Sequence, residues 1–213
     1  MIRDIINFGT EGGLSVFQIA EVRDRAMLEE EVRLIKTLTD IPFYLTALLT
    51  DDWNNDLTPW KAEGVHNSGS FGDRAPDTLS ILLEQAEKRE GEKIIAGYSL
   101  SGLFALWTSF QTDIFSRAVA CSPSVWYPGF QEYSGSRKLL ASHVYLSIGD
   151  REGFARNPIL RNVDVRLKEI AEHLGPDRAF FEYNSGNHFS DVPLRVARGI
   201  SWEAERAWKN FPE

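Results

Sequence analysis

The chain is poor in cysteine and in long apolar runs, and each scarcity excludes a class of protein. Cys121 is the single cysteine among 213 residues, so neither an internal disulfide nor a cysteine-cluster zinc site can form. No apolar stretch approaches the roughly 20 residues that a membrane-spanning helix needs. Residues 1–13 lack the apolar core of a signal peptide, and we therefore expect a cytoplasmic protein without a membrane partner.

Positive charge is also scarce. The chain has 23 Lys and Arg residues against 31 Asp and Glu residues, which gives a formal net charge of −8. This balance, without a concentrated basic patch, disfavours a nucleic-acid partner. The hydrophobic share of 43% is ordinary for a globular protein with a sizeable core. No repeat, low-complexity tract or linker interrupts the chain, so we expect one domain over residues 1–213.

Apolar strand patterns and amphipathic helix patterns alternate along the chain. Strands are expected at residues 14–20, 42–50, 94–96, 116–122, 143–148 and 179–183. Helices are expected at residues 23–39, 75–88, 103–107, 163–174 and 192–208. Residues 1–13 are mixed and Gly-rich, and we expect an irregular lead-in there. The alternation predicts an α/β fold, a three-layer α/β/α sandwich around a doubly wound, mainly parallel sheet of about six strands.

A serine between small residues joins the third of these strands to its helix. The segment reads Gly97-Tyr98-Ser99-Leu100-Ser101-Gly102, between one apolar run and the next. This is the pattern of a nucleophile elbow, a sharp strand-to-helix turn that exposes one Ser oxygen above the sheet. Ser101 stands where the pattern usually has its second glycine, so the match is G-x-S-x-S-G. The simpler interpretation is a Ser/Gly-rich turn of any α/β protein, and the rest of the chain has to decide.

Charged and imidazole side chains follow two later strands. Asp150 and Glu152 come directly after the strand at residues 143–148, and His188 follows the strand at residues 179–183. Loops after parallel strands meet at one edge of the sheet. The chain order Ser, acid, His is that of α/β-hydrolases. We predict Ser99 as nucleophile, His188 as general base and Glu152 as the acid, with Asp150 as the alternative acid.

Two further groups of the site are expected from the architecture. The oxyanion hole should use the backbone N–H of Leu100 and a donor from the loop after residues 42–50, where Asp52 and Trp53 are candidates. Trp53 and Trp126 lie in loops at the same edge, and we expect them in a pocket for an acyl or aryl group. Plain packing of long loops is the alternative interpretation of both tryptophans.

Four motifs resemble one branch of the α/β-hydrolases. They are GYSLSGLF at residues 97–104, SPSVW at residues 122–126, GDRE at residues 149–152 and NHF at residues 187–189. The branch includes enterochelin esterase-like siderophore esterases, esterase D and mycolyltransferases. In this resemblance Ser99 matches the nucleophile, His188 the base and Glu152 the acid. The antiparallel strands that often open this fold are not expected here, because the N-terminal region is short.

The resemblance implies hydrolysis of a small carboxylic ester or thioester, without a metal or other cofactor. An acyltransferase of the same fold is an alternative, in which an alcohol replaces water as the acceptor. A non-catalytic ligand-binding domain is the alternative from another class. A phosphate-binding loop is disfavoured, because residues 97–102 contain no Lys and match neither phosphate-loop spacing.

Overall fold

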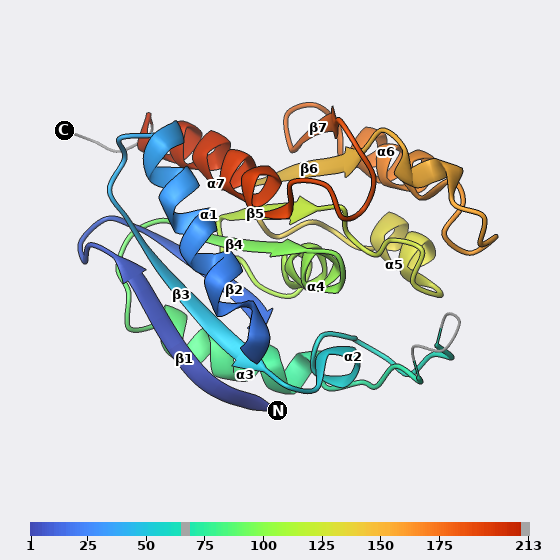
Figure 1. The fold of residues 1–213 in the computed structure, drawn as a ribbon, viewed down its shortest axis with the longest axis horizontal. Coiled ribbons are helices and arrows are strands. Elements are labelled where there is room, and N and C mark those ends of the chain that lie inside the picture. The colour runs from blue at the N-terminus through green and yellow to red at the C-terminus, as the bar shows by residue number, and fades with distance from the viewer. Residues whose placement is uncertain (65–68, 210–213) are drawn as a thin grey trace.

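A seven-stranded sheet forms the middle layer of the computed structural model, which describes residues 1–64 and 69–209. The strand order is β1-β3-β2-β4-β5-β6-β7, and every neighbouring pair is parallel except β1 with β3. The expected α/β fold and mainly parallel sheet are confirmed (Figure 1). The strands are β1 (Ile2–Gly9), β2 (Leu14–Glu21), β3 (Phe43–Thr50), β4 (Lys93–Tyr98), β5 (Arg117–Cys121), β6 (His143–Gly149) and β7 (Ala179–Asn184).

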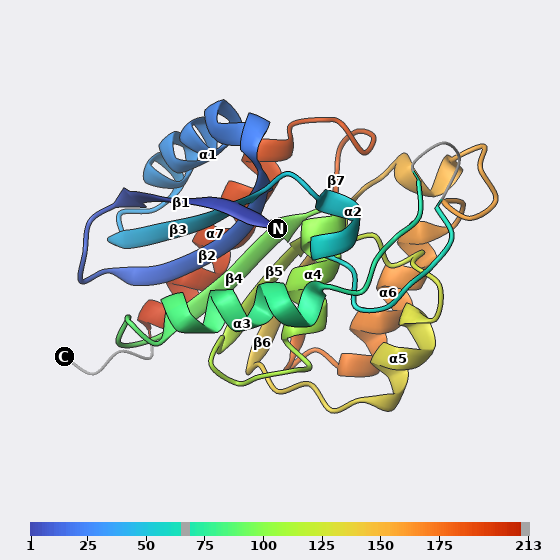
Figure 2. The ribbon, with the colours of Figure 1, turned by 90° about the horizontal axis from the view of Figure 1, so that it is seen from below.

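Helices cover both faces of the sheet (Figures 1 and 2). The helices α1 and α7 pack together on one face, and α3, α4, α5 and α6 lie on the other. The α-helices are α1 (Arg25–Leu38), α2 (Trp53–Asp56), α3 (Ala75–Ala86), α4 (Leu100–Thr108), α5 (Phe130–Ser136), α6 (Val163–Leu174) and α7 (Val192–Trp208). Two short 3₁₀ turns are η1 (Val22–Asp24) and η2 (Glu152–Phe154). Among the described residues, none of the helices has the length and apolar character needed to cross a membrane.

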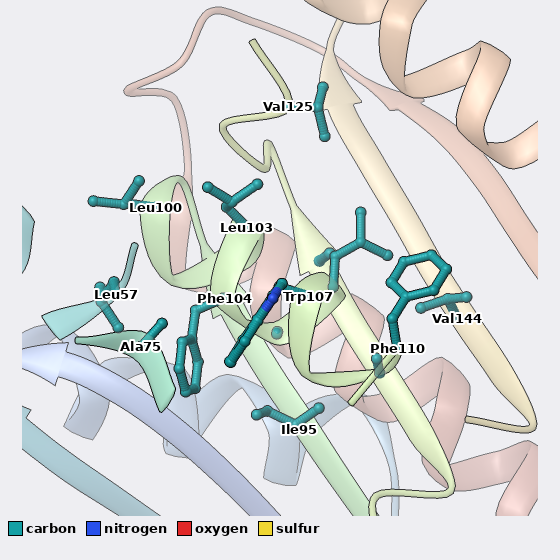
Figure 3. Close-up of a cluster of buried hydrophobic side chains, with 14 of the residues drawn as sticks. Leu57, Ala75, Ile95, Leu100, Leu103, Phe104, Trp107, Phe110, Val125 and Val144 are labelled. Atoms are coloured by element: carbon teal, nitrogen blue, oxygen red, sulfur yellow. The ribbon is translucent and has the colours of Figure 1, made fainter. Parts of the chain in front are cut away.

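Each face of the sheet has its own hydrophobic core. On the α1/α7 face, side chains such as Leu28 and Ile200 pack on alternate strand residues such as Val16. On the opposite face the helix α4 is buried along its whole length. Its side chains Leu103, Phe104 and Trp107 pack among residues of the strands and of α3 (Figure 3). Burial on both faces explains why the inner strands are apolar almost throughout. The two cores thus hold α4 and α7 on opposite faces of the sheet.

The prediction of an irregular lead-in at residues 1–13 is wrong. Strand β1 pairs antiparallel with β3, from Ile2 opposite Thr50 to Gly9 opposite Tyr44. An antiparallel strand therefore does open this fold, and the sheet has seven strands rather than about six. Only Ile6 of β1 is buried. As an edge strand it needs few apolar residues, which explains the weak sequence signal.

Two short helices also lie where the sequence predicts loops. The helix α2 directly follows β3, and α5 follows the SPSVW segment. Segments of four and seven residues are too short to give a clear helical period. The loop expected after residues 42–50 runs through α2, and residues 65–68 lie outside the described residues.

Candidate active site

Ser99 lies on a sharp turn between β4 and α4. Its backbone has φ 57° and ψ −119°, a conformation that costs a non-glycine residue energy. Two backbone hydrogen bonds fix the turn: Ser99 N–H donates to Cys121 O and Ser124 N–H donates to Ser99 O, each at 3.0 Å. The turn leaves the Ser99 hydroxyl at the carboxyl edge of the sheet, where the loops after the neighbouring strands meet.

Ser101, which stands where the elbow pattern usually has glycine, makes a hydrogen bond to the sheet. Its Oγ donates a hydrogen bond to Ile19 O of β2 at 2.7 Å. A Cβ atom at Gly97 would overlap the backbone oxygen of Ser101, so the strand and helix approach closely only because residue 97 is glycine. The serine therefore fits the position that glycine more often fills, and its hydroxyl ties α4 to the sheet.

Three side chains from separate loops form a hydrogen-bonded chain. Ser99 Oγ lies 3.0 Å from His188 Nε2, and His188 Nδ1 lies 2.7 Å from Glu152 Oε2. Ser99 follows β4, Glu152 lies in η2 after β6, and His188 follows β7. The structure thus brings together the three residues that the sequence predicts as nucleophile, acid and base. A proton on Nδ1 facing the carboxylate leaves Nε2 free to accept the Ser99 proton.

Glu152 is held in its ionised form although it is buried. Its Oε1 accepts hydrogen bonds from Ser122 Oγ at 2.6 Å, Gly149 N at 2.8 Å and Arg195 Nη2 at 3.1 Å. Burial raises the pKa of the carboxyl. The hydrogen bonds from His188, Ser122 and Gly149 and the charge of His188 outweigh that effect, and the resulting pKa is about 2. Both carboxylate oxygens are therefore engaged, one with His188 and the other with the donors that hold the side chain in place.

The alternative acid Asp150 has a different position. Its Oδ1 accepts the Gly186 N–H at 2.9 Å, and about half of its side-chain surface is exposed. This bond ties the end of β6 to the loop that carries His188. The contact with the imidazole itself comes from Glu152, because the 3₁₀ turn η2 brings the residue three places after Gly149 back over the strand end.

A cavity of about 410 Å³ opens beside Ser99 and His188. Its apolar walls come from the SPSVW segment, the residues after β6 and the His188 loop. The described residues that line it are Ser99, Ser122, Pro123, Ser124, Trp126, Arg151, Glu152, Phe154, Ala155, Leu160, Val163, Asn187, His188 and Phe189. Trp126 is therefore in the expected pocket. Trp53 is absent from this lining and packs half-buried against the core, because α2 folds its side chain inward.

Comparison with known proteins gives matches only at the level of structure. No family model and no curated protein matches the sequence. An IroE-like serine hydrolase from Shewanella oneidensis aligns with TM-score 0.74 and 15% identity over 94% of this chain and 75% of its own. The siderophore hydrolase EstA from Aspergillus nidulans aligns with TM-score 0.70 and 18% identity over 93% and 86% of the two chains. The chain has the α/β-hydrolase fold.

A third match extends this α/β-hydrolase comparison. FphF from Staphylococcus aureus, a fluorophosphonate-binding serine hydrolase, aligns with TM-score 0.63 and 10% identity over 94% of this chain and 97% of its own. At these identities the matches establish the fold, and the roles of individual residues have to be argued from the site itself. In residues 1–64 and 69–209 no group of three or more His, Cys, Asp or Glu side chains is arranged to hold a metal ion.

Leu100 and Trp53, two of the three candidates for an oxyanion hole, are each the first residue of a helix. Leu100 opens α4 and Trp53 opens α2. Backbone N–H groups at such positions have no acceptor inside their helix. Asp52, the other candidate from the same loop, donates its N–H to Thr50 Oγ1 at 3.0 Å. Because the Asp52 N–H is engaged in this way, Trp53 remains the candidate donor from this loop.

Sequence analysis missed four residues of this region. Arg195 of α7 is buried and contacts Glu152, and Tyr98 of β4 donates its hydroxyl to His188 O at 2.8 Å. Phe154 and Phe189 line the cavity, yet 82% and 86% of their surfaces are exposed. Tyr98 and Phe189 stand in the GYSLSGLF and NHF motifs, next to Ser99 and His188, and these positions are the signal that the sequence offers for them. For Arg195 it offers none.

Proposed function

We propose that this protein is a serine hydrolase that cleaves a small carboxylic ester or thioester through an acyl-enzyme on Ser99. The observation that carries the proposal is the chain from Ser99 Oγ through His188 to Glu152, with successive distances of 3.0 and 2.7 Å. A serine hydroxyl is a weak nucleophile unless an adjacent base takes its proton. Here the base is within hydrogen-bond reach of the serine, and an ionised carboxylate orients the base.

The proposed first step is attack of Ser99 Oγ on the ester carbonyl carbon. His188 Nε2 accepts the serine proton, and the carbonyl π electrons move to the oxygen. Collapse of this tetrahedral intermediate breaks the bond to the alkoxy or thiolate group, which takes the proton from His188. Water then attacks the acyl-enzyme by the same route and gives the carboxylic acid and free Ser99. Throughout, Glu152 stabilises the positive charge that develops on the imidazole.

The negative oxygen of the intermediate needs hydrogen-bond donors. We assign this role to the backbone N–H of Leu100, which directly follows Ser99 and opens α4, and to that of Trp53. The N-terminal end of α4 adds a favourable helix dipole at the same place. Donors fixed in the backbone require no rearrangement as the charge forms.

The cavity favours a substrate with a compact apolar or aromatic group. Its volume of about 410 Å³ suits a small molecule. Trp126, Phe154 and Phe189 offer flat aromatic surfaces around it, while Arg151 adds one cationic group. Apolar contact with these rings would hold the acyl or aryl group, so that the ester carbon lies near Ser99 Oγ.

A panel of activated aryl and alkyl esters and thioesters tests the proposal. Wild-type protein should hydrolyse part of the panel with saturation, and Ser99→Ala should abolish turnover without changing the thermal unfolding midpoint. Ser80→Ala is the matched control, since Ser80 is an exposed serine of α3 that does not line the cavity. Full activity of Ser99→Ala would overturn the assignment. Inert behaviour of wild type across the panel would favour the ligand-binding alternative.

A further inference from the structure

Arg195 is a buried charge whose side-chain partners all belong to the candidate active site. The residue is 1% exposed and lies in the first turn of α7. Removing a guanidinium from water costs several kcal/mol unless it is paired and hydrogen-bonded. Its side-chain hydrogen bonds go to Glu152, Tyr98 and Asn187. These are the acid itself, the residue before the nucleophile and the residue before the base.

The first contact fixes the acid. Arg195 Nη2 donates to Glu152 Oε1 at 3.1 Å, beside the bonds from Ser122 and Gly149 to the same oxygen. A glutamate has one more rotatable bond than an aspartate, so ordering it costs more conformational entropy. Holding Oε1 from three sides determines where Oε2 lies, which is the atom that contacts His188 at 2.7 Å.

The second set of contacts fixes the base. Arg195 Nη1 donates to Tyr98 Oη at 2.6 Å, and Tyr98 Oη donates in turn to His188 O at 2.8 Å. The same nitrogen also donates to Asn187 O at 3.3 Å. The rings of Tyr98 and His188 lie 5.4 Å apart. The backbone of the otherwise exposed His188 loop is thus tied to α7 through the planar guanidinium of Arg195.

We propose that Arg195, with Tyr98 as its relay, is a positioning residue that sets the geometry between Glu152 and His188. The proposal rests on the proposed function for its kinetic consequence, but its structural content does not depend on turnover. The planar guanidinium reaches the acid and the base loop at once through two nitrogens. A lysine at this position has a single side-chain nitrogen and can hold either Glu152 or the His188 loop, but not both. Arg195→Lys should therefore lose part of the positioning.

The test observes the proton between His188 and Glu152 directly. A proton on His188 Nδ1 that is bonded to a carboxylate gives a strongly downfield NMR resonance, which its loss in His188→Asn identifies. In Arg195→Met and Arg195→Lys this resonance should move upfield and exchange faster with water. In Tyr98→Phe it should keep its position and exchange faster, because that change loosens only the His188 backbone. Arg198→Met is the matched control, since Arg198 is an exposed arginine on the same helix.

The same variants give a kinetic readout on an ester substrate. We expect kcat to fall by about 10- to 100-fold in Arg195→Met, with KM nearly unchanged, because misplacement of a catalytic group acts on the chemical step. Tyr98→Phe removes one hydroxyl and should lower kcat about fivefold. Since it leaves the buried charge paired, it also serves as the deciding variant if Arg195→Met does not fold. Arg198→Met should match wild type in both measurements.

The outcomes separate this proposal from the proposed function. If wild type hydrolyses esters, but the position of the resonance in Arg195→Met and its exchange rate and kcat in both Arg195→Met and Tyr98→Phe equal those of wild type, the positioning role is wrong and the hydrolase stands. If wild type hydrolyses nothing while the resonance shifts as expected, the hydrolase is wrong and the positioning role stands. Equal resonances in Arg195→Lys and wild type would also contradict the bridging role.

Discussion

Ser122 donates its hydroxyl to Glu152 Oε1 at 2.6 Å, which gives the SPSVW segment a function within the site. Ser122 also has φ 42°, so the segment bends sharply just after β5. The bend directs the hydroxyl at the acid, while Pro123, Ser124 and Trp126 continue along the cavity wall. One short segment therefore anchors Glu152 and forms part of the cavity wall.

Ser122→Ala should weaken the acid without removing it. A hydrogen bond to a charged group contributes about 1.5–3 kcal/mol, and its loss should raise the pKa of Glu152, because this bond is one of those that lower it. We expect a roughly tenfold lower kcat for an ester substrate and a lower free energy of unfolding by denaturant. Unchanged values of both quantities would mean that Ser122 does not support the acid.

Glu152→Gln should cost more activity than Asp150→Asn. Glutamine keeps the shape of the side chain but loses the charge that stabilises protonated His188, so kcat should fall by on the order of a hundredfold or more. Asp150 bonds to the Gly186 backbone instead of the imidazole, and its substitution should reduce kcat only a few-fold. Steady-state kinetics of the two variants decide the matter, and the reverse ranking would transfer the acid role to Asp150.

Glu31 should make the protein less stable at alkaline pH. This residue of α1 is 1% exposed, and burial raises the pKa of its carboxyl to about 8, although a hydrogen bond from Gln18 acts in the opposite direction. The folded state therefore binds the proton more tightly than the unfolded state, so stability falls as pH rises from about 4.5 to 8. Above about pH 8 the destabilisation by the ionised Glu31 carboxylate reaches its full value.

Glu31→Gln should remove this dependence, since glutamine remains neutral. Because one pKa unit corresponds to about 1.4 kcal/mol, the rise of the pKa from 4.5 to about 8 predicts that the variant gains on the order of 5 kcal/mol in unfolding free energy at pH 9. At pH 5 the gain should be much smaller. Denaturant unfolding at the two pH values measures the difference between variant and wild type. An equal gain at both would show that the carboxyl does not titrate in this window.

Phe189→Ala should raise KM for aryl esters while leaving the fold intact. The ring lines the cavity and is 86% exposed, so it contributes little to the core. Loss of an aromatic contact of about 1 kcal/mol predicts roughly a fivefold higher KM for an aryl ester and a smaller change for a short alkyl ester. Val22→Ala is the control, as Val22 is an exposed apolar residue outside the cavity lining among the described residues. Equal effects of Phe189→Ala on both ester classes would contradict an aryl pocket at this position.

The inner elements of the fold are readable from the sequence, and the edge of the sheet is not. Strands such as β3 are buried on both faces and leave continuous apolar runs. Strand β1 has a single buried residue, Ile6, and its pairing with β3 depends on residues about 40 positions away. Local pattern carries little information on such an edge strand.

A similar distinction holds within the site. Ser99, Glu152 and His188 each follow a strand, so the parallel topology alone predicts that they meet. Arg195 instead occupies one position of an amphipathic helix, where an arginine ordinarily faces solvent. Its burial results from Glu152 and Tyr98, which are 43 and 97 residues away in the chain. The sequence predicts Trp53 in the pocket, but in the structure it lies on the four-residue helix α2, which is too short to predict, and packs against the core.

The central claim is that Ser99 is an activated nucleophile, and covalent labelling tests it most directly. Wild type and Ser99→Ala are exposed to a fluorophosphonate probe, and the intact-protein masses are measured. We expect a single adduct on wild type, no adduct on Ser99→Ala and slower labelling of Glu152→Gln. An adduct that persists in Ser99→Ala, or no adduct on wild type, would contradict the claim.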